Sequence, residues 1–357
     1  METKKIDSEQ KKCKNCGGNL IFSPKTQNLI CENCGSEKEI IISGEIQKHN
    51  LNEKAIQNKE YKEYVEQNKS FKCPNCGANV VLSKFEISQI CPYCATALVV
   101  NNKNDYGLKP DAIIPFAFNE NDASEIFANA VKKRFFAPRK FKKKLPENQI
   151  TGIYIPCFGF EAETSSVYDG ELYNNETETD SDGRSHTRKS YFHISGNWNY
   201  KYENVMVECS SQITQLQLKG FTPYKYGKQK PYNNSFILGY SVEQYDKEVH
   251  DCEEQYNYEL NTLIKRDILK KYSYDGVGYL NIKTERNNEK FTYHILPVYK
   301  FEYDYNNKKY ITYMNGQTGK VDNNLPKSKI KVALAILLPI LIFLIPFIIA
   351  IITSAGE

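Results

Sequence analysis

The longest apolar segment of the sequence lies near its C-terminal end. Residues 332–352 read VALAILLPILIFLIPFIIAII and contain no charged, amide or histidine side chain. At about 1.5 Å per residue, a helix of this length reaches roughly 30 Å, the thickness of the hydrocarbon core of a bilayer. We therefore expect a transmembrane helix at 332–352, within a C-terminal membrane anchor at 327–357.

Charges near this segment predict its orientation. Lys327, Lys329 and Lys331 precede it, only Thr353 to Glu357 follow, and lysines stay on the cytoplasmic side. Residues 1–12, METKKIDSEQKK, form a polar tail without the apolar region of a signal peptide. We expect a single-pass protein of the cell membrane, with lipid contacts through the C-terminal helix and its N-terminal bulk in the cytoplasm.

Between residues 101 and 326, strand patterns surround two helical patterns. The segments AIIPFAF, ITGIYIPCFGFEAE and SYFHISGNWNY have strand character, and a helix is predicted from Asn119 to Arg134. In a second round, FILGYSV, GYLNIKT, FTYHILPVYKFEY and KKYITYMNG are the strands, and Asp246 to Tyr272 is the helix. We predict an α+β domain at 101–326, a β-α-β-β module present twice with mainly antiparallel sheet.

Composition and two short motifs refine this prediction. The aromatic fraction of 13%, with 26 tyrosines, favours half-buried β-structure. A net charge of +4 is too small to indicate a nucleic-acid-binding protein by itself. The acidic segment Glu171 to Asp182 lacks the ligand spacing of a calcium loop and predicts a hairpin loop. The GQTGK motif at 316–320 is too short for a phosphate-binding loop and predicts a β-turn.

Eight of the eleven cysteines form a repeated pattern. Two C-x2-C pairs separated by fourteen residues occur twice, as Cys13, Cys16, Cys31, Cys34 and as Cys73, Cys76, Cys91, Cys94. Each set supplies four thiolates for one tetrahedral Zn²⁺, and disulfides are not expected in the cytosol. Gly17, Gly35 and Gly77 follow the second cysteine of their pairs, where a turn needs positive φ, whereas Ala95 departs from this pattern.

These cysteines predict two four-cysteine zinc ribbons, at 13–43 and at 71–100, separated by a charged spacer at 44–70. Each ribbon holds one structural zinc ion, because four cysteine ligands leave no open position for a substrate. A ribbon of thirty residues cannot bury enough apolar surface to fold without its metal. The predicted fold is therefore multi-domain: two ribbons, the α+β domain and the C-terminal transmembrane helix.

A basic stretch in the α+β domain is open to three interpretations. Phenylalanines at 135, 136 and 141 lie among eight cations: Lys132, Lys133, Arg134, Arg139, Lys140, Lys142, Lys143 and Lys144. Such a stretch suits nucleic acid, anionic lipid, or a solvated helix end whose phenylalanines enter the core.

The remaining cysteines do not suggest catalysis. Cys157, Cys209 and Cys252 are single, and His250 lies two residues before Cys252 on a predicted helix, where the two do not share a face. We find no nucleophile–base arrangement or paired carboxylates. We therefore expect no enzyme, no catalytic residue and no cofactor besides zinc.

With these motifs in place, the chain resembles the bacterial TFIIB-type zinc-ribbon membrane proteins. The resemblance rests on the double ribbon, the YIPCFGFEA and LPVYKFEY segments, the NGQTGKV segment and the C-terminal apolar run. The resemblance implies that the protein helps to hold partners such as phage-shock-protein-A-like coat proteins at the membrane during envelope stress. Other relatives are labelled as similar to the primosomal replication helicase, although this sequence has neither a phosphate loop nor helicase motifs.

Two functions follow as hypotheses. The first is a non-enzymatic, tail-anchored membrane adaptor whose cytosolic ribbons recruit a partner protein. The alternative is a membrane-tethered, nucleic-acid-binding ribbon protein, although the second ribbon is almost neutral and such ribbons are usually more basic. The apolar candidates for a partner surface are Leu20, Ile21 and Phe22 in the first ribbon and Val80, Val81 and Leu82 in the second. Some of them must pack inside their own ribbon, but a module this small cannot bury them all.

Overall fold

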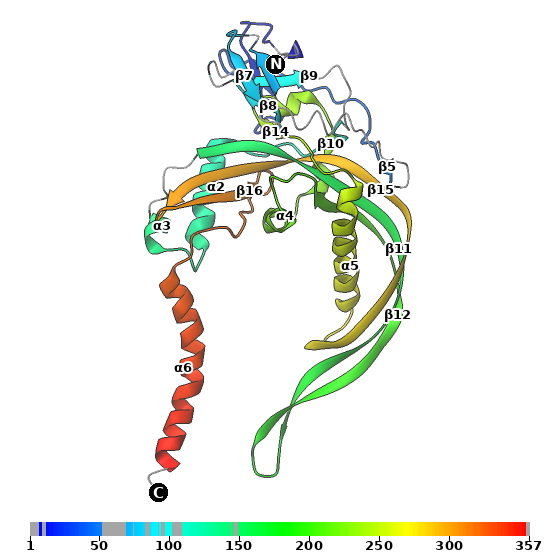
Figure 1. Ribbon diagram of the computed structural model, residues 1–357, viewed down its shortest axis with the longest axis vertical. Coiled ribbons are helices and arrows are strands. Elements are labelled where there is room, and N and C mark those ends of the chain that lie inside the picture. The colour runs from blue at the N-terminus through cyan, green and yellow to red at the C-terminus, as the bar shows by residue number, and fades with distance from the viewer. Residues whose placement is uncertain are drawn as a thin grey trace.

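Two long antiparallel strands lie at the centre of the main sheet and bend into an arch (Figure 1). They are β11, Gln149–Thr179, and β15, Gly276–Tyr305, which pair along most of their length. The computed structural model describes residues 7–8, 12–51, 69–73, 75–82, 86–91, 93, 97–101, 109–143, 145 and 149–354. Among these residues, eleven strands belong to one sheet.

The central part of β11 is covered on both faces, because its residues from 153 to 162 are all buried. Alternate side chains of a strand point to opposite faces. Ile153, Ile155 and Cys157 belong to one apolar cluster, whereas Tyr154 and Phe158 belong to a second, larger one. Beyond residue 162, buried and exposed positions alternate, as in a sheet with one solvated face.

The order strand, helix, strand, strand occurs twice in the body. The first set is β10 (Ala112–Ile113), α2 (Glu120–Lys133), β11 and β12 (Ser185–Glu208), with the short helix α3 (Arg139–Lys143) after α2. The second set is β14 (Ser241–Glu243), α5 (Glu253–Leu269), β15 and β16 (Lys308–Asn315).

The two sets are interlocked through their first strands. Strand β10 pairs in parallel with β15 of the other set, and β14 pairs in parallel with β11. The long strands β11 and β15 pair with each other, and β12 and β16 pair with β11 and β15 respectively, all antiparallel. The body is therefore a mostly sheet α+β unit in which neither set pairs only within itself.

Helices α2 and α5 pack on the sheet through aromatic contacts. Phe127 of α2 stacks on Phe301 with ring centroids 4.1 Å apart, and Tyr256 of α5 stacks on Phe160 at 4.4 Å. Helix α2 begins with a capping box, in which Asn119 accepts a hydrogen bond from the Asp122 N–H. Figure 1 shows α5 inside the bend of the arch. These contacts hold both helices on the sheet.

Shorter elements complete the body between β12 and α5. They are α4 (Gln215–Phe221), β13 (Lys230–Pro231) and three single-turn helices, η1 (Tyr226–Lys228), η2 (Asn234–Ile237) and η3 (His250–Cys252). Helix α4 contributes Leu218 and Phe221 to the smaller apolar cluster.

The strands are longer than the sequence predicted. The acidic segment expected as a loop is strand as far as Thr179, and the turn itself contains Asp180, whose carboxylate accepts from the Arg184 N–H at 2.8 Å. The predicted strands at 278–284 and 291–303 are one strand, β15. In both places polar residues occupy exposed positions of paired strands, so hydropathy alone indicated a loop that the backbone pairing does not form.

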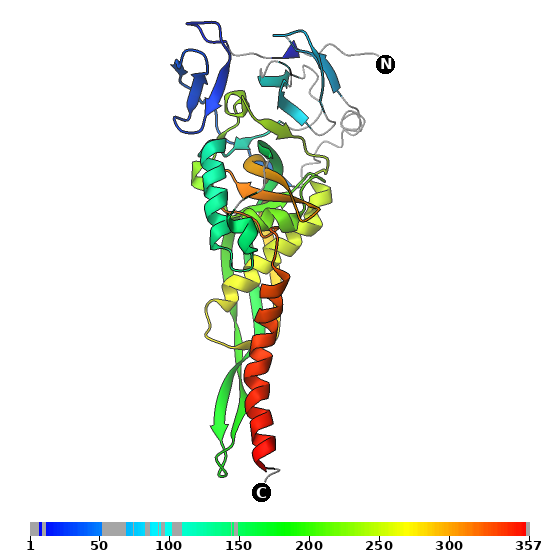
Figure 2. The same ribbon diagram turned by 90° about the vertical axis from the view of Figure 1, so that its left-hand side faces the viewer.

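The two cysteine-rich hairpins lie side by side over one end of the body (Figure 2). The first consists of β2 (Leu20–Ser23), β3 (Asn28–Cys31) and β4 (Glu37–Lys38). The second consists of β6 (Lys69–Lys72), β7 (Asn79–Leu82), β8 (Glu86–Ile90) and β9 (Ala97–Asn101). Lys12 Nζ donates to Asn75 Oδ1 across the two at 3.5 Å.

Strand pairing joins the second hairpin to the body. Strand β8 pairs antiparallel with β14, and β9 pairs with β8 and with β1 (Asp7–Ser8). Strands β8 and β9 therefore extend the main sheet, whereas β6 and β7 pair with each other in a separate two-stranded sheet.

The segment between the hairpins contacts the body where it is described. Strand β5, His49–Asn50, pairs with β15. Lys48 Nζ lies 2.5 Å from Glu161 Oε2, and His49 Nε2 lies 2.9 Å from Asp111 Oδ1. The part of the predicted spacer at 52–68 lies outside the described residues.

The C-terminal helix α6 runs from Lys329 to Ser354. Among the helices that the structure describes, none is long and apolar enough to cross a membrane. The predicted anchor at 327–357, its transmembrane helix at 332–352 and the single-pass membrane localisation are therefore wrong. A helix that spans a bilayer needs about 20 consecutive, predominantly apolar residues.

Candidate metal centres

The first cysteine cluster has the spacing of a tetrahedral metal site. The Sγ atoms of Cys13, Cys16, Cys31 and Cys34 lie within 4.8 Å of one another. The Cys13–Cys34 and Cys16–Cys31 sulfur pairs are 3.7 and 3.4 Å apart. Four sulfurs at about 2.3 Å from one Zn²⁺ would be about 3.8 Å apart, whereas a disulfide needs about 2.05 Å. The sulfurs therefore fit a shared ion and not disulfides.

Two similar turns present these sulfurs. The Gly17 N–H donates to the Cys13 carbonyl and the Gly35 N–H to the Cys31 carbonyl, both at 2.9 Å. Both glycines have φ of +71°, a conformation that residues with a Cβ rarely adopt. The Gly18 N–H lies 3.4 Å from Cys16 Sγ and donates to it. The glycine positions predicted from the sequence are thus the positions that shape the turns.

The second cluster repeats this geometry for the three cysteines that are described. The Sγ atoms of Cys73, Cys76 and Cys91 lie within 4.8 Å of one another, and the Cys76–Cys91 pair is 3.8 Å apart. The Gly77 N–H donates to the Cys73 carbonyl at 2.8 Å, with φ of +73°. Cys94, the fourth predicted ligand, lies outside the described residues.

The thiols of the first cluster differ in their readiness to ionise. The Ser36 hydroxyl, 3.0 Å from Cys34 Sγ, and the Ser36 N–H lower the pKa of Cys34 to about 6. The Gly18 N–H lowers the pKa of Cys16, but the facing thiols of Cys31 and Cys34 outweigh it and raise that pKa to about 12. Cys34 therefore becomes a thiolate at a lower pH than Cys16, and binding of a metal by all four sulfurs must release protons.

The first hairpin is docked on the body through its apolar residues. The Phe22 N–H donates to the Leu238 carbonyl at 2.9 Å, and the Phe22 ring meets Phe236 edge-on with centroids 5.4 Å apart. Gln27 Nε2 donates to the Phe116 carbonyl at 2.8 Å. Phe22 is only 2% exposed. This hairpin is therefore part of the core of the molecule.

This docking corrects the expected partner surface. Leu20 and Phe22 are buried and Ile21 is half-buried, so these residues face their own hairpin and the body. Val80 is buried as well, whereas the side chains of Val81 and Leu82 lie outside the described residues. The hairpin is too small to bury its own apolar side chains, and it does so against the body.

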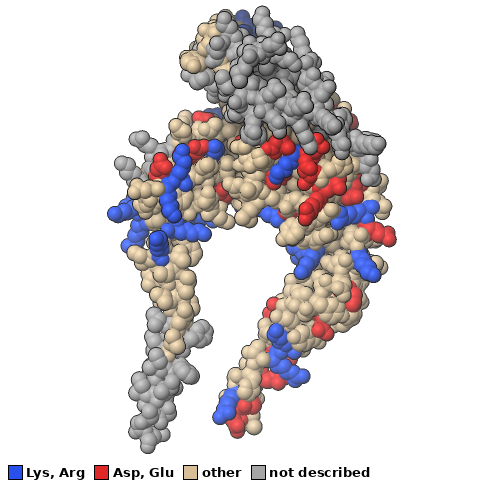
Figure 3. All heavy atoms as spheres, in the orientation of Figure 1, with Lys and Arg blue, Asp and Glu red and all other residues tan. Residues whose placement is uncertain are grey.

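The basic stretch divides into a buried and an exposed part. Phe141 of α3 is fully buried, whereas Phe135 is 68% and Phe136 41% exposed. Figure 3 shows Lys and Arg side chains gathered on the side of the molecule where α2 and α3 lie. The core interpretation therefore holds for one phenylalanine and fails for the other two. Lys144 lies outside the described residues.

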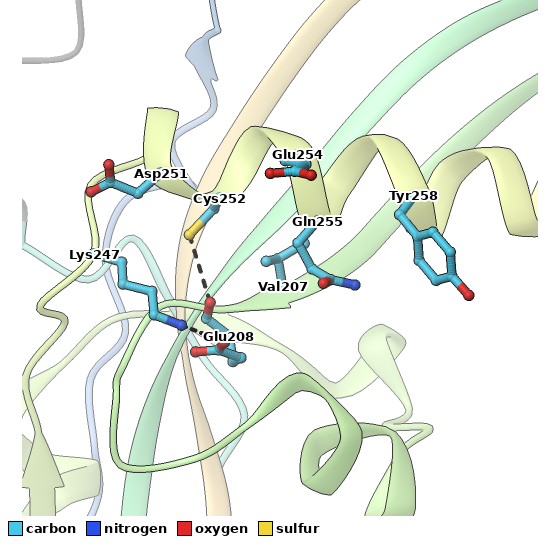
Figure 4. Close-up of a pocket in the computed structure, with 8 residues that line it drawn as sticks. All are labelled: Val207, Glu208, Lys247, Asp251, Cys252, Glu254, Gln255 and Tyr258. Atoms are coloured by element: carbon cyan, nitrogen blue, oxygen red, sulfur yellow. Dashed lines mark hydrogen bonds and ion pairs between the residues drawn. The ribbon is translucent and has the colours of Figure 1, made fainter.

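A polar pocket of about 420 Å³ lies between α5, η3 and the end of β12 (Figure 4). Lys247 Nζ is 2.5 Å from Glu208 Oε1, and Cys252 Sγ donates to the Glu208 carbonyl at 3.6 Å. Burial raises the pKa of Cys252 to about 12, so this thiol is protonated at neutral pH. Cys252 therefore ties η3 to β12 and is not an activated nucleophile.

Other chemical groups of the body are buried in its core. Cys157 and Cys209 are fully buried, and burial raises the pKa of both. His294, opposite Cys157 in the sheet, has its pKa lowered to about 3 by burial. Its Nδ1 has no hydrogen-bond partner among the described residues. An isolated histidine in an apolar strand carries no sequence signal, and His294 was not predicted as a functional residue from the sequence.

The GQTGK segment forms the turn after β16 that the sequence predicted. The Gly319 N–H donates to the Asn315 carbonyl at 2.9 Å, and Lys320 Nζ bonds to the Thr222 carbonyl. The lysine is thus used within the fold.

The comparisons with known proteins give a full-length relative without an assigned role. The uncharacterized protein YdjG of Bacillus subtilis (strain 168) is 27% identical over 334 residues, which cover 90% of this chain and 91% of YdjG. No protein-family model matches the chain, and no solved structure matches it.

Proposed function

We propose that the protein is a non-enzymatic adaptor that recruits a partner protein through two zinc ribbons fixed to an α+β body. The observation that carries this proposal is the position of the two cysteine clusters. Each lies in a hairpin joined to the same end of the body, one by the Phe22 contact and one by β8 pairing, and Lys12 and Asn75 connect them.

Zinc is the metal that these clusters fit best. Sites with four cysteine sulfurs in tetrahedral arrangement are typical of structural Zn²⁺. The residues that would hold the two ions are Cys13, Cys16, Cys31, Cys34 and Cys73, Cys76, Cys91, Cys94. A tetrahedral ion with four protein ligands has no open position, so its contribution is to hold the hairpin in shape.

The recruiting surface consists of exposed apolar residues in the ribbons. Tyr93, beside Cys91 and Cys94, is 71% exposed, and Ile41, after the last strand of the first ribbon, is 80% exposed. Tyrosine is enriched among residues that dominate binding energy at protein interfaces. Since the ribbons are held on the body, a partner meets two sites at a fixed separation and loses little freedom on engaging both.

The resemblance to bacterial TFIIB-type zinc-ribbon proteins names a partner class for a first test. A phage-shock-protein-A-like coat protein is the candidate that this resemblance suggests.

The experiment compares two matched double variants of the tagged full chain. Tyr93→Glu with Ile41→Glu changes the ribbon surface, and Tyr258→Glu with Leu216→Glu places the same charges on the body, where Tyr258 is 62% and Leu216 80% exposed. After crosslinking in cells, the principal partner should be recovered with the wild type and the body variant. We expect at least about tenfold less with the ribbon variant, the loss that about 1.4 kcal/mol of binding energy produces.

Zinc content measured on each variant shows that the ribbons remain folded. Equal recovery of the partner with the ribbon variant would show that the body, and not the ribbon surface, is the recruiter.

A further inference from the structure

Ten cations lie where the end of α2, helix α3 and the start of α6 meet. We name this group of cations the basic shoulder: Lys132, Lys133, Arg134, Arg139, Lys140, Lys142, Lys143, Lys327, Lys329 and Lys331. Residues far apart in the sequence are joined here, because the Ser328 N–H donates to the Phe136 carbonyl at 2.8 Å. Lys331 Nζ also donates to the Phe135 carbonyl at 2.8 Å.

Within the described part of the chain, none of these ten cations forms a salt bridge. Elsewhere in the structure, Lys48 and Lys247 form salt bridges with glutamate carboxylates. In the shoulder, Arg134 and Lys142 donate instead to carbonyl or amide oxygens. Burial raises the pKa of the Asp322 carboxyl to about 6, and the nearby charge of Arg134 acts against this rise. Burial first, and then the neighbouring Lys142 and Arg139, lower the pKa of Lys331. The cations therefore repel one another at close range.

A hollow of about 490 Å³ lies within the shoulder. Lys133, Arg134 and Lys327 supply its cationic lining. Its apolar lining consists of Phe135, Phe136, Ala137, Leu325 and Pro326. Phe135 and Phe136 meet edge-on with ring centroids 5.2 Å apart and are both exposed. The hollow thus combines positive charge with an apolar surface large enough for part of an organic ligand.

Local structural roles account for only part of this arrangement. Lys132 and Lys133 interact favourably with the C-terminal end of the α2 dipole, and Phe141 fills the core. The cations contributed by α3 and by residues 327–331 are not explained in this way, and neither is the exposure of Phe135. A bound anion would compensate the charge and cover the aromatic surface together.

We propose that the basic shoulder binds a ligand in which phosphate is attached to an apolar or aromatic organic part. Ammonium and guanidinium groups are the side chains that bind phosphate oxygens most strongly. A phospholipid headgroup and a soluble phosphate ester share this chemistry. This site is separate from the zinc ribbons and does not depend on the adaptor function.

The test uses the full chain and one pair of matched variants. Lys133→Glu with Lys327→Glu reverses two charges at the hollow, and Lys265→Glu with Lys283→Glu reverses two exposed, distant lysines on α5 and β15. The probes are inorganic pyrophosphate, titrated by calorimetry, and sedimented vesicles of phosphatidylglycerol or of phosphatidylcholine.

We expect the wild type and the α5/β15 variant to bind pyrophosphate or phosphatidylglycerol vesicles. Neither protein should bind phosphatidylcholine vesicles. The shoulder variant should bind at least about tenfold more weakly, because direct contacts to phosphate are lost as well as net charge. Binding of pyrophosphate indicates a soluble ligand, and binding of phosphatidylglycerol alone indicates a lipid headgroup. Absence of binding to both probes, equal binding to phosphatidylcholine, or equal loss in both variants would overturn the proposal.

Discussion

Replacement of Cys31 by serine is expected to unfold the first ribbon and to remove one zinc ion per chain. Cys31 is 1% exposed, and its sulfur lies 3.4 Å from Cys16 Sγ inside the cluster. Structural zinc contributes roughly 10–16 kcal/mol to small domains of this kind, and a serine hydroxyl cannot replace the thiolate ligand. The second ribbon shares no ligand with the first and should keep its ion.

In the body, amide exchange should change only at residues that the first ribbon covers. Unfolding of the ribbon withdraws Phe22 from Phe236 and Tyr240, so amide exchange should rise around these residues. The paired strands β11 and β15 should remain protected. Limited proteolysis, zinc analysis and hydrogen exchange together measure these effects.

Cys252→Ser is the matched control, because Cys252 lies outside both clusters and serine can still donate to the Glu208 carbonyl. It should keep the wild-type zinc content. A Cys31→Ser protein with two zinc ions and an intact, protease-resistant first ribbon would be incompatible with the proposed ligand set.

Phe22→Ala is expected to separate the first ribbon from the body while both metal sites remain filled. The Phe22 ring packs edge-on against Phe236 and beside Tyr240 and is almost completely buried. Truncation of a buried phenylalanine costs about 3–5 kcal/mol, which is enough to shift a docked hairpin to a partly undocked state.

Hydrogen exchange at the Phe22 amide, which donates to Leu238, reports this separation directly. Phe135→Ala serves as the control because that ring is 68% exposed, and its exchange pattern at the ribbon should match the wild type. Unchanged exchange in Phe22→Ala would mean that the ribbon is held by contacts other than this ring.

The cysteine clusters and the turns that present them were predictable from the sequence. The fourteen-residue gap between C-x2-C pairs, together with Gly17, Gly35 and Gly77, indicates two metal-compatible clusters. These features depend on residues a few positions apart, and the turn geometry they need leaves a clear signal.

Long-range contacts were not predictable in the same way. The sequence placed Phe22 on a partner surface, because nothing local indicates that Leu238 and Phe236 would receive it. It also divided β15 in two, because Arg286 to Lys290 are polar, although Arg286, Asn287 and Lys290 pair with β11 on either side of a register shift. Hydropathy reports burial at each position, whereas docking and strand pairing depend on residues far away in the chain.

The prediction of a transmembrane helix was also wrong. A run of apolar letters from 332 to 352 satisfies the length rule by itself, but within the described structure no helix meets that rule. The adaptor proposal therefore rests on the ribbons and the body alone.

Native mass spectrometry of the purified full chain measures directly how many zinc ions the two ribbons hold. We predict two zinc ions per chain, together with loss of the protons that the cysteine thiols release on binding. A mass that corresponds to one ion or to none, in protein purified without chelator and with its cysteines reduced, would contradict it.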